Sequence, residues 1–190
     1  MICTNITDQV PFLWPEPEYR PAGVHLSDII KLMREEYLGQ VYPDDADLEP
    51  DELAAVTMKR QRGFMWERIC ETAYSGMVLP RGKPFLFRGI WVSPDGVGIR
   101  REGERIEVDE IKFTDSFKTP IDQAPWKWQH ATYCLASGAT GGRFYVCHNF
   151  GISRGGERPL PQVYHVEYGG VELEENFEQI TNFAKAKGMI

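Results

Sequence analysis

The segment between residues 85 and 114 constrains the fold more than any other part of the sequence, because strand and turn signals follow one another closely there. Apolar and aromatic residues dominate its first stretch, and Ser93-Pro94-Asp95-Gly96 is a turn sequence. Glu102-Gly103-Glu104 supplies a second turn. The strands that these turns separate are expected at residues 85–93, 97–101 and 105–114. Three consecutive strands joined by turns indicate a β-sheet at the centre of the chain.

Helical patterns surround this sheet on both sides in the sequence. Ser27 begins a helix whose apolar residues recur at helical spacing, and Gly39 ends it. A longer helix is expected over Asp51 to Ser75, with an interruption near Gly63. The remaining elements are helices at residues 126–137, ended by Gly138, and 172–187, and strands at 143–149 and 162–168. This order predicts an α/β fold with a mixed central sheet flanked by helices.

Length and composition fit one globular domain behind a proline-rich arm. The chain has 190 residues, of which 42% are hydrophobic and 26% charged. Residues 1–23 hold Pro11, Pro15, Pro17 and Pro21, so we expect an extended arm there and a single domain over residues 24–190. No apolar run approaches the roughly 20 residues that cross a bilayer, and the first residues do not resemble a signal peptide. We therefore expect a cytoplasmic protein without membrane contact.

The cysteines and the net charge argue against two other classes of protein. Cys3, Cys70, Cys134 and Cys147 lie far apart without a C-x-x-C pair, so no zinc or iron–sulfur signature is present and reduced thiols are expected. The formal net charge of −7 argues against a protein that coats nucleic acid electrostatically. The negative net charge does not exclude an enzyme that holds cations between carboxylates.

Three residues, one in the first turn and two in the third strand, form the candidate for chemistry. Residues two apart in a strand share a face, so Glu110 and Lys112 point the same way. Asp95 lies opposite them on the adjoining hairpin. Two carboxylates can hold Mg²⁺, which activates water and neutralises charge on a scissile phosphate, and a nearby lysine can hold the attacking water. This set fits phosphodiester hydrolysis.

Each part taken alone has an ordinary structural interpretation. A Glu-x-Lys tripeptide on a strand is usually a solvated ion pair, and an aspartate in Ser-Pro-Asp-Gly is usually a turn residue. The catalytic interpretation depends on the number and order of the coincident parts.

The ordered motifs resemble the PD-(D/E)XK nuclease superfamily, whose signature is Pro-Asp, a spacer and Glu-x-Lys. Gly63-Phe64-Met65-Trp66-Glu67, on the helix before the strands, is similar to the region of the first acidic ligand in the RecB-like and lambda-exonuclease-like branch. Gln129-His130-Ala131-Thr132-Tyr133 resembles the Gln-x-x-x-Tyr element of the same branch. Positions i and i+4 share a helix face, so Gln129 and Tyr133 would project together. The resemblance covers residues 24–187 and implies a restriction-endonuclease-like fold.

The resemblance also implies a role for each matching residue. Asp95 and Glu110 would bind Mg²⁺ or Mn²⁺ directly, with the backbone carbonyl of Ile111 as a further ligand. Glu67 would bind the metal directly or through water, with Glu71 one turn on as a rival. Lys112 would position the nucleophilic water. Gln129 and Tyr133 would orient Lys112 or a DNA phosphate. The histidine that many relatives carry on the first helix has no counterpart at this position.

Other polar and aromatic residues could have a structural role or contact DNA. His130 is interpreted as a surface or DNA-proximal residue, and His148 and His165 as structural. Trp126 and Trp128 could stack on bases, although core or rim packing is the better interpretation. Two basic sets could contact the DNA backbone or form solvated faces: Lys59, Arg60, Arg62 and Arg68, described as a stripe near Glu67, and Arg100, Arg101 and Arg105.

The function expected from this resemblance is metal-dependent hydrolysis of DNA by an exonuclease of recombination or repair, encoded by a phage or a cell. The expected partners are DNA, further copies of the chain in a homo-oligomer, and a recombination or single-strand-binding protein. The site of action would be the cytoplasm, or the host cytoplasm for a phage protein. Two alternatives stay open: a structure-specific or restriction-type endonuclease of the same fold, and a non-catalytic DNA-binding or assembly protein.

Overall fold

The computed structural model describes residues 20–41, 47–74, 77–100, 104–114, 119–148 and 161–190. Residues 1–19 of the predicted arm and residues 102 and 103 of the predicted turn at 102–104 lie outside the described residues. The elements in chain order are α1 (Leu26–Leu38), α2 (Pro50–Ala73), β1 (Phe85–Phe87), β2 (Ile90–Val92), β3 (Gly96–Ile99), β4 (Ile106–Thr114), the short 3-10 helix η3 (Pro120–Asp122), α3 (Ala124–Ser137), β5 (Gly141–His148), β6 (Pro161–Glu167) and α4 (Gly170–Ala186). No helix among the described residues is long and apolar enough to cross a membrane.

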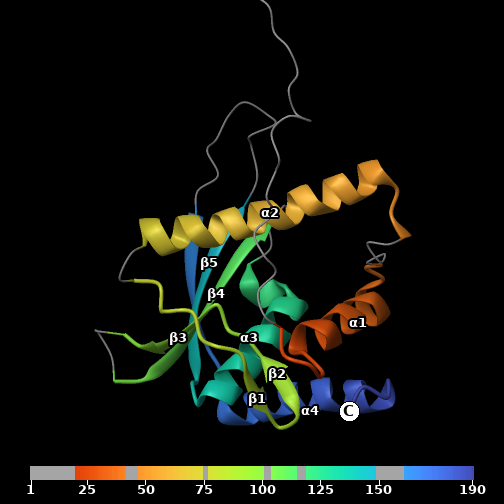
Figure 1. Ribbon diagram of the computed structural model, residues 1–190. Helices are drawn as coiled ribbons and strands as arrows, with labels where there is room; N and C mark the ends of the chain where they lie inside the picture. Colours follow the sequence, from red (N-terminus) through yellow and green to blue (C-terminus); the bar gives the residue numbers. More distant parts are fainter. Residues whose placement is uncertain (1–19, 42–46, 75–76, 101–103, 115–118, 149–160) are drawn as a thin grey trace, which may run out of the picture.

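A four-stranded sheet forms the centre, in the order β3-β4-β5-β6 (Figure 1). β4 and β5 run parallel, whereas the β3–β4 and β5–β6 pairs are antiparallel. The parallel pair needs a crossover connection, and α3 supplies it between β4 and β5. The predicted α/β class with a mixed central sheet is therefore confirmed.

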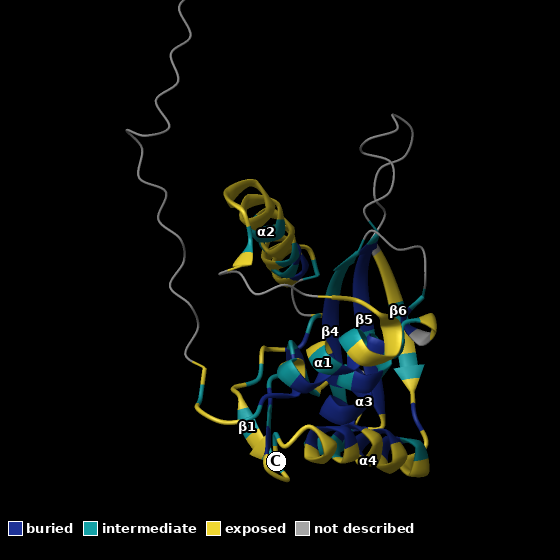
Figure 2. Cartoon of the chain, turned by 90° about the vertical axis from the view of Figure 1, so that its right-hand side faces the viewer, coloured by how far each residue is buried: buried dark blue, intermediate teal, exposed yellow. Residues whose placement is uncertain are grey.

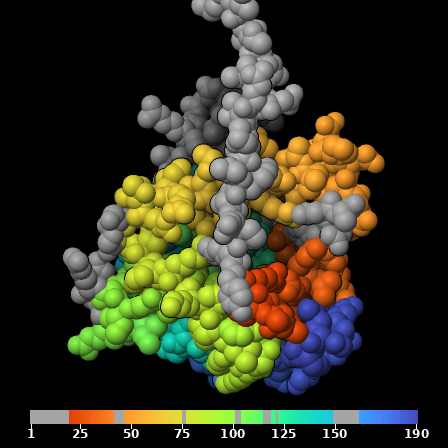
Figure 3. All heavy atoms as spheres, in the orientation of Figure 1, coloured from red at the N-terminus to blue at the C-terminus, as the bar shows by residue number. Residues whose placement is uncertain are grey.

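Helices cover the two faces of the sheet unequally. α1, α3 and α4 bury the larger core against one face, and α2 packs Trp66 and Cys70 against Ile111, Tyr145 and Cys147 on the other. Figure 2 shows α2 standing apart from α4, with much of its surface exposed. In Figure 3 the yellow and orange atoms of α2 lie in the upper part of the molecule. Among the described residues, three helices thus cover one face of the sheet, and α2 with the connection that follows it covers the other.

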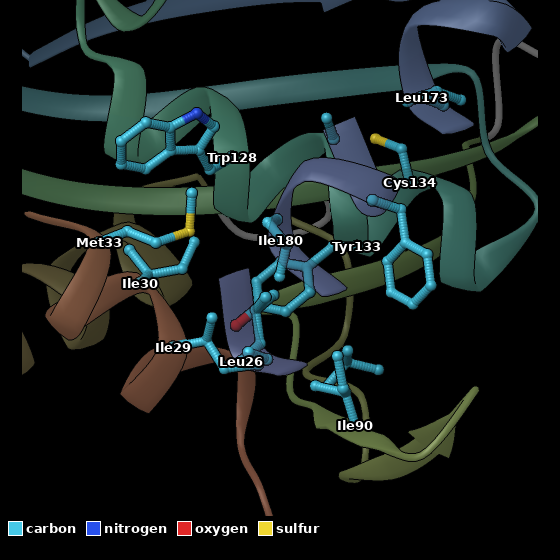
Figure 4. Packing of buried hydrophobic residues seen from close by; sticks show 14 of the residues in the cluster. Leu26, Ile29, Ile30, Met33, Ile90, Trp128, Tyr133, Cys134, Leu173 and Ile180 are labelled. Carbon is cyan, nitrogen blue, oxygen red and sulfur yellow. The ribbon is translucent and has the colours of Figure 1, made fainter. Parts of the chain in front are cut away.

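The larger core depends on apolar residues of the three helices that meet at helical spacing. Ile29, Ile30 and Met33 of α1 are buried against α3 and α4, as the repeat in the sequence indicates. Figure 4 shows Met33 beneath Trp128, which is 8% exposed and belongs to this core. Trp128 therefore packs in the interior.

Three details differ from the sequence-based expectation. The predicted strand 85–93 is a hairpin of β1 and β2, because Arg88 and Gly89 adopt positive φ angles of 45° and 87° and reverse the chain. α2 runs through Gly63 without a break, since one glycine costs a helix only about 1 kcal/mol. α1 begins at Leu26 after His25, one residue before Ser27.

His130 is wholly buried between α3 and the sheet, so its interpretation as a surface or DNA-proximal residue is wrong. Its Nε2 donates to the Val108 carbonyl of β4 at 3.1 Å, and its Nδ1 accepts from the Tyr168 hydroxyl at 3.0 Å. Burial lowers the pKa of His130 to about 4. A neutral imidazole therefore joins the helix that carries Gln129 and Tyr133 to the strand that carries Glu110.

We expect this imidazole to give the protein a pH-dependent stability. The pKa of His130 is lower in the folded chain than the value near 6.5 of an unfolded histidine, so its contribution is complete above about pH 6.5 and is lost as the pH falls toward 4. The loss amounts to roughly 3 kcal/mol at most. His130→Gln, whose amide can both donate and accept, should lack this component. Denaturant unfolding at a series of pH values measures the difference, and equal slopes in both proteins would contradict the expectation.

Candidate functional site

The ladder between β3 and β4 stops where the candidate site begins. Gly96 pairs with Asp109 at the end of β3, so one further step of the same register places Asp95 opposite Glu110. Asp95 does not continue the backbone ladder. Its Oδ2 instead accepts the N–H of Ile111 at 2.8 Å. A carboxylate thus occupies the edge of β4 at the point where the neighbouring strand ends.

The carbonyl of Ile111 lies on this same open edge. The N–H and C=O of one strand residue point to the same side of the strand, because paired residues exchange both bonds. Since the Ile111 N–H points toward Asp95, its carbonyl also faces the edge that Asp95 shares. The geometry suits the predicted backbone ligand, whose role stays a prediction.

Glu110 and Lys112 lie together on the face of β4 that meets α3. The Lys112 ammonium donates to Glu110 Oε1 and to Gln129 Oε1, the latter at 3.3 Å. Gln129 Nε2 donates to the Tyr133 hydroxyl at 3.0 Å. A chain of hydrogen bonds therefore runs from Glu110 through Lys112 to Gln129 and Tyr133 of α3.

Glu110 is buried in an unusual electrostatic setting. It has no exposed surface, and its Oε2 has no hydrogen-bond partner among the described residues. Burial raises the pKa of Glu110 to about 8; Lys112 opposes this shift, whereas the carboxylates of Asp95 and Glu67 add to it. Burial would lower the pKa of Lys112, but Glu110 and Asp95 raise it overall, so the lysine stays charged. Two further carboxylates therefore act on Glu110 beside the Lys112 ammonium, which is 19% exposed.

Glu67 reaches the site from α2, on the opposite layer. Its neighbour Trp66 anchors this turn of the helix by donating from Nε1 to the Tyr145 carbonyl at 3.2 Å. The Glu67 carboxylate lies 3.7 Å from Arg81 and raises the pKa of Glu110. Its rival Glu71 pairs instead with Arg68 on the surface of α2, at 3.9 Å. Glu67, and not Glu71, is among the carboxylates that raise the pKa of Glu110.

The donors at this edge fit a hard divalent cation. No three His, Cys, Asp or Glu side chains in the described part of the chain are grouped closely enough to form a metal cluster by themselves. Mg²⁺ needs no such cluster, because it keeps several waters and binds proteins through one or two carboxylates. Asp95 and Glu110 are oxygen donors, and Glu110 Oε2 is a buried acceptor that nothing in the described protein satisfies. A cation would satisfy it.

The basic residues named from the sequence behave differently from one another. Arg100 is 7% exposed and donates to Glu107, Asp109 and the Met77 carbonyl, so it cannot contact DNA. Arg101 lies outside the described residues, and Arg105 is exposed, 4.0 Å from Glu167. Helical geometry distributes the four cations of α2 around the helix, so they form no single stripe. They are Lys59, Arg60, Arg62 and Arg68.

Sequence reasoning missed Arg81. It lies in the connection between α2 and β1, where no periodicity or motif marks one cation among its neighbours. Its proximity to Glu67 depends on how this connection crosses the sheet, which the sequence does not reveal.

Comparisons with known proteins show the fold. No family model matches the sequence, and no curated protein matches it. The solved structure of SSO0001 is similar at a TM-score of 0.51 and 13% identity, over 88% of this chain and 79% of that one. The alkaline exonuclease LHK-Exo from Laribacter hongkongensis gives a TM-score of 0.49 at 13% identity, over 84% and 77% of the two chains. Its complex with dAMP gives 0.47 at 14% identity over the same shares.

The match to SSO0001 shows a shared fold and no chemistry, because only 13% of the residues are identical. The functional argument for this chain therefore rests on the geometry of Asp95, Glu110, Lys112 and the residues around them.

We expect Glu110→Gln to stabilise the metal-free protein at alkaline pH. The pKa of Glu110 is raised in the folded chain, so its contribution to stability is complete below about pH 4.5 and is lost as the pH rises through about 8. Glutamine cannot ionise. In EDTA at about pH 8.5 the variant should exceed the wild type by about 1 kcal/mol or more, which raises Tm by roughly 2–4 °C.

Thermal unfolding in EDTA at several pH values provides the measurement. The advantage of the variant should shrink toward about pH 5, where the wild-type carboxyl is neutral as well. Glu175→Gln, at an exposed position of α4, serves as the control. A Glu110→Gln protein that is less stable than the wild type at alkaline pH would show that the buried carboxylate is held favourably without a metal.

Proposed function

We propose that the protein is a metal-dependent nuclease that hydrolyses phosphodiester bonds of DNA. The observation that carries the proposal is the buried Glu110–Lys112 pair beside Asp95, with one Glu110 oxygen left without a partner among the described residues. Burying a carboxylate with an unsatisfied oxygen costs stability, and a structural ion pair would gain nothing from it. A site that receives a cation and a phosphate accounts for the cost.

The residues have separate tasks in this proposal. Asp95 and Glu110 would hold Mg²⁺ or Mn²⁺, together with the Ile111 carbonyl and with Glu67 directly or through water. Such a cation lowers the pKa of bound water and neutralises charge on the scissile phosphate. Lys112 holds the attacking water and offsets the negative charge that develops in the transition state.

Gln129 and Tyr133 position Lys112. The Gln129 carbonyl oxygen accepts a hydrogen bond from the Lys112 ammonium, and the Gln129 amide nitrogen donates one to the Tyr133 hydroxyl. Because an amide with both ends engaged cannot rotate freely, the lysine keeps one direction.

Within this proposal we favour an exonuclease of recombination or repair, acting in the cytoplasm of a cell or of a phage host. A homo-oligomer and a recombination or single-strand-binding protein are the proposed partners besides DNA. An endonuclease of the same fold and a non-catalytic DNA-binding protein are the outcomes that the following experiment separates.

Digestion of end-labelled linear DNA and covalently closed circular DNA, with Mg²⁺ and with EDTA, tests the proposal. We expect degradation of the linear substrate in Mg²⁺ and none in EDTA, with the circle intact because an exonuclease needs an end. Glu110→Gln should abolish cleavage and still bind DNA, since it removes a metal ligand and no backbone contact. Cleavage of the circle would indicate an endonuclease. DNA binding without cleavage of either substrate in any divalent metal would indicate a non-catalytic protein.

We expect Lys112→Ala to lower turnover far more than DNA binding. The ammonium acts when negative charge builds up in the transition state, so its loss costs on the order of 100-fold in rate. Single-turnover rates at saturating DNA provide the measurement. A loss below about threefold, with weaker binding and a flatter salt dependence, would make Lys112 a phosphate contact instead.

A further inference from the structure

The connection between α2 and β1 is fixed to the sheet along residues 77–82, here called the strap. The Met77 carbonyl accepts from Arg100 and from the Tyr145 hydroxyl, the latter at 3.1 Å. The Leu79 N–H donates to Asp109 Oδ2 at 2.7 Å, and the Val97 N–H donates to the Pro80 carbonyl at 3.1 Å. An irregular segment is therefore held by hydrogen bonds to β3, β4 and β5.

The strap lies so close to β3 that a side chain would not fit between them. A Cβ placed on Gly96 would meet the Leu79 carbonyl oxygen at 2.7 Å, which is closer than real Cβ atoms come. Only glycine allows this approach. The strap therefore passes in direct contact with Gly96, the residue that follows Asp95.

Charged groups buried under the strap also hold it in place. Asp109 is wholly buried and Arg100 nearly so, and the two pair while each also bonds a backbone group of the strap. A buried ion pair is expensive to desolvate and is weak grounds for stability, but it fixes the position of whatever it bonds. The conformation of this short connection is thus strongly specified.

The strap carries one arginine to the rim of the candidate site. Arg81 Nη1 lies 3.7 Å from Glu67 Oε2, and 45% of the arginine side chain is exposed. A partly exposed ion pair at this distance contributes at most about 1 kcal/mol. An ion pair of this strength does not prevent the guanidinium from also binding an anion.

The charge of the site favours such an anion-binding role for Arg81. Glu67, Asp95 and Glu110 repel one another and would also repel a DNA phosphate. Lys112 is 19% exposed and already pairs with Glu110. Arg81 is the more exposed cation of the two, and a guanidinium can bind a phosphate through two parallel N–H bonds. We infer that Arg81, held on the strap, binds a phosphate of the nucleic acid strand that enters the site.

This inference rests on the proposed nuclease function and is tested mainly without catalysis. Binding of a labelled short DNA duplex is measured by fluorescence anisotropy in EDTA over a series of NaCl concentrations. The half-saturating DNA concentration of single-turnover cleavage in Mg²⁺ is a second measure. We expect Arg81→Gln to weaken both on the order of tenfold and to reduce the salt slope by about one, as the loss of one phosphate contact requires. The rate at saturating DNA should change less than about threefold.

Arg88→Gln is the matched control. Arg88 is also a half-exposed arginine that pairs with a glutamate, Glu174 at 2.8 Å, but this pair joins the β1–β2 turn to α4, away from the site. The Arg88→Gln variant should bind DNA with the affinity of the wild type. Arg81→Lys should fall between wild type and Arg81→Gln, because lysine keeps the charge and loses the two-bond geometry.

A double-variant comparison separates phosphate binding from simple neutralisation of Glu67. If Arg81 binds phosphate, Arg81→Gln weakens DNA binding in a Glu67→Gln background as well. If Arg81 merely screens Glu67, the effect disappears there, and the inference is wrong. It is equally wrong if Arg81→Gln binds DNA within about twofold of Arg88→Gln. A wild-type protein that neither binds nor cleaves DNA would instead overturn the proposed function, and this inference with it.

Discussion

The hydrogen bond from the Ile111 N–H to the Asp95 carboxylate determines how the rest of the site is arranged. It replaces the backbone bond that a longer β3 would have made, so the ladder ends and one edge of β4 stays open. An open edge beside a carboxylate exposes backbone groups to a ligand instead of to another strand. Each other contribution, from Glu110, Lys112 and Glu67, is arranged around that opening.

β4 serves two layers at once, because successive residues point to opposite faces. Asp109 faces the strap and Arg100, where its charge is matched by good partners. Glu110 faces α3, where burial raises its pKa and one oxygen stays unsatisfied. Burial raises the pKa of both acids, of Asp109 to about 6 and of Glu110 to about 8. Asp109 has hydrogen-bond partners on the strap and on Arg100, whereas one Glu110 oxygen has none among the described residues, and this difference suits a cation site at Glu110.

The sequence indicates those parts of the site that follow from local periodicity. Strand parity places Glu110 with Lys112, and helical spacing places Gln129 with Tyr133. The Arg88-Gly89 turn was hidden because apolar residues continue on both sides of it. The burial of His130 and the position of Arg81 were not predictable, since both depend on contacts between elements far apart in the chain.

The pairing of Arg100 with Asp109 also has a consequence for how the chain selects its native strand alignment. A slip of β4 by one residue would turn Asp109 toward the apolar layer and leave Arg100 buried without its carboxylate. An unpaired buried charge costs several kcal/mol, so misaligned sheets would be depleted from the folded population. Molecules that complete folding would then carry the open edge of β4 in its proper register, and an inactive but compact isomer would not accumulate.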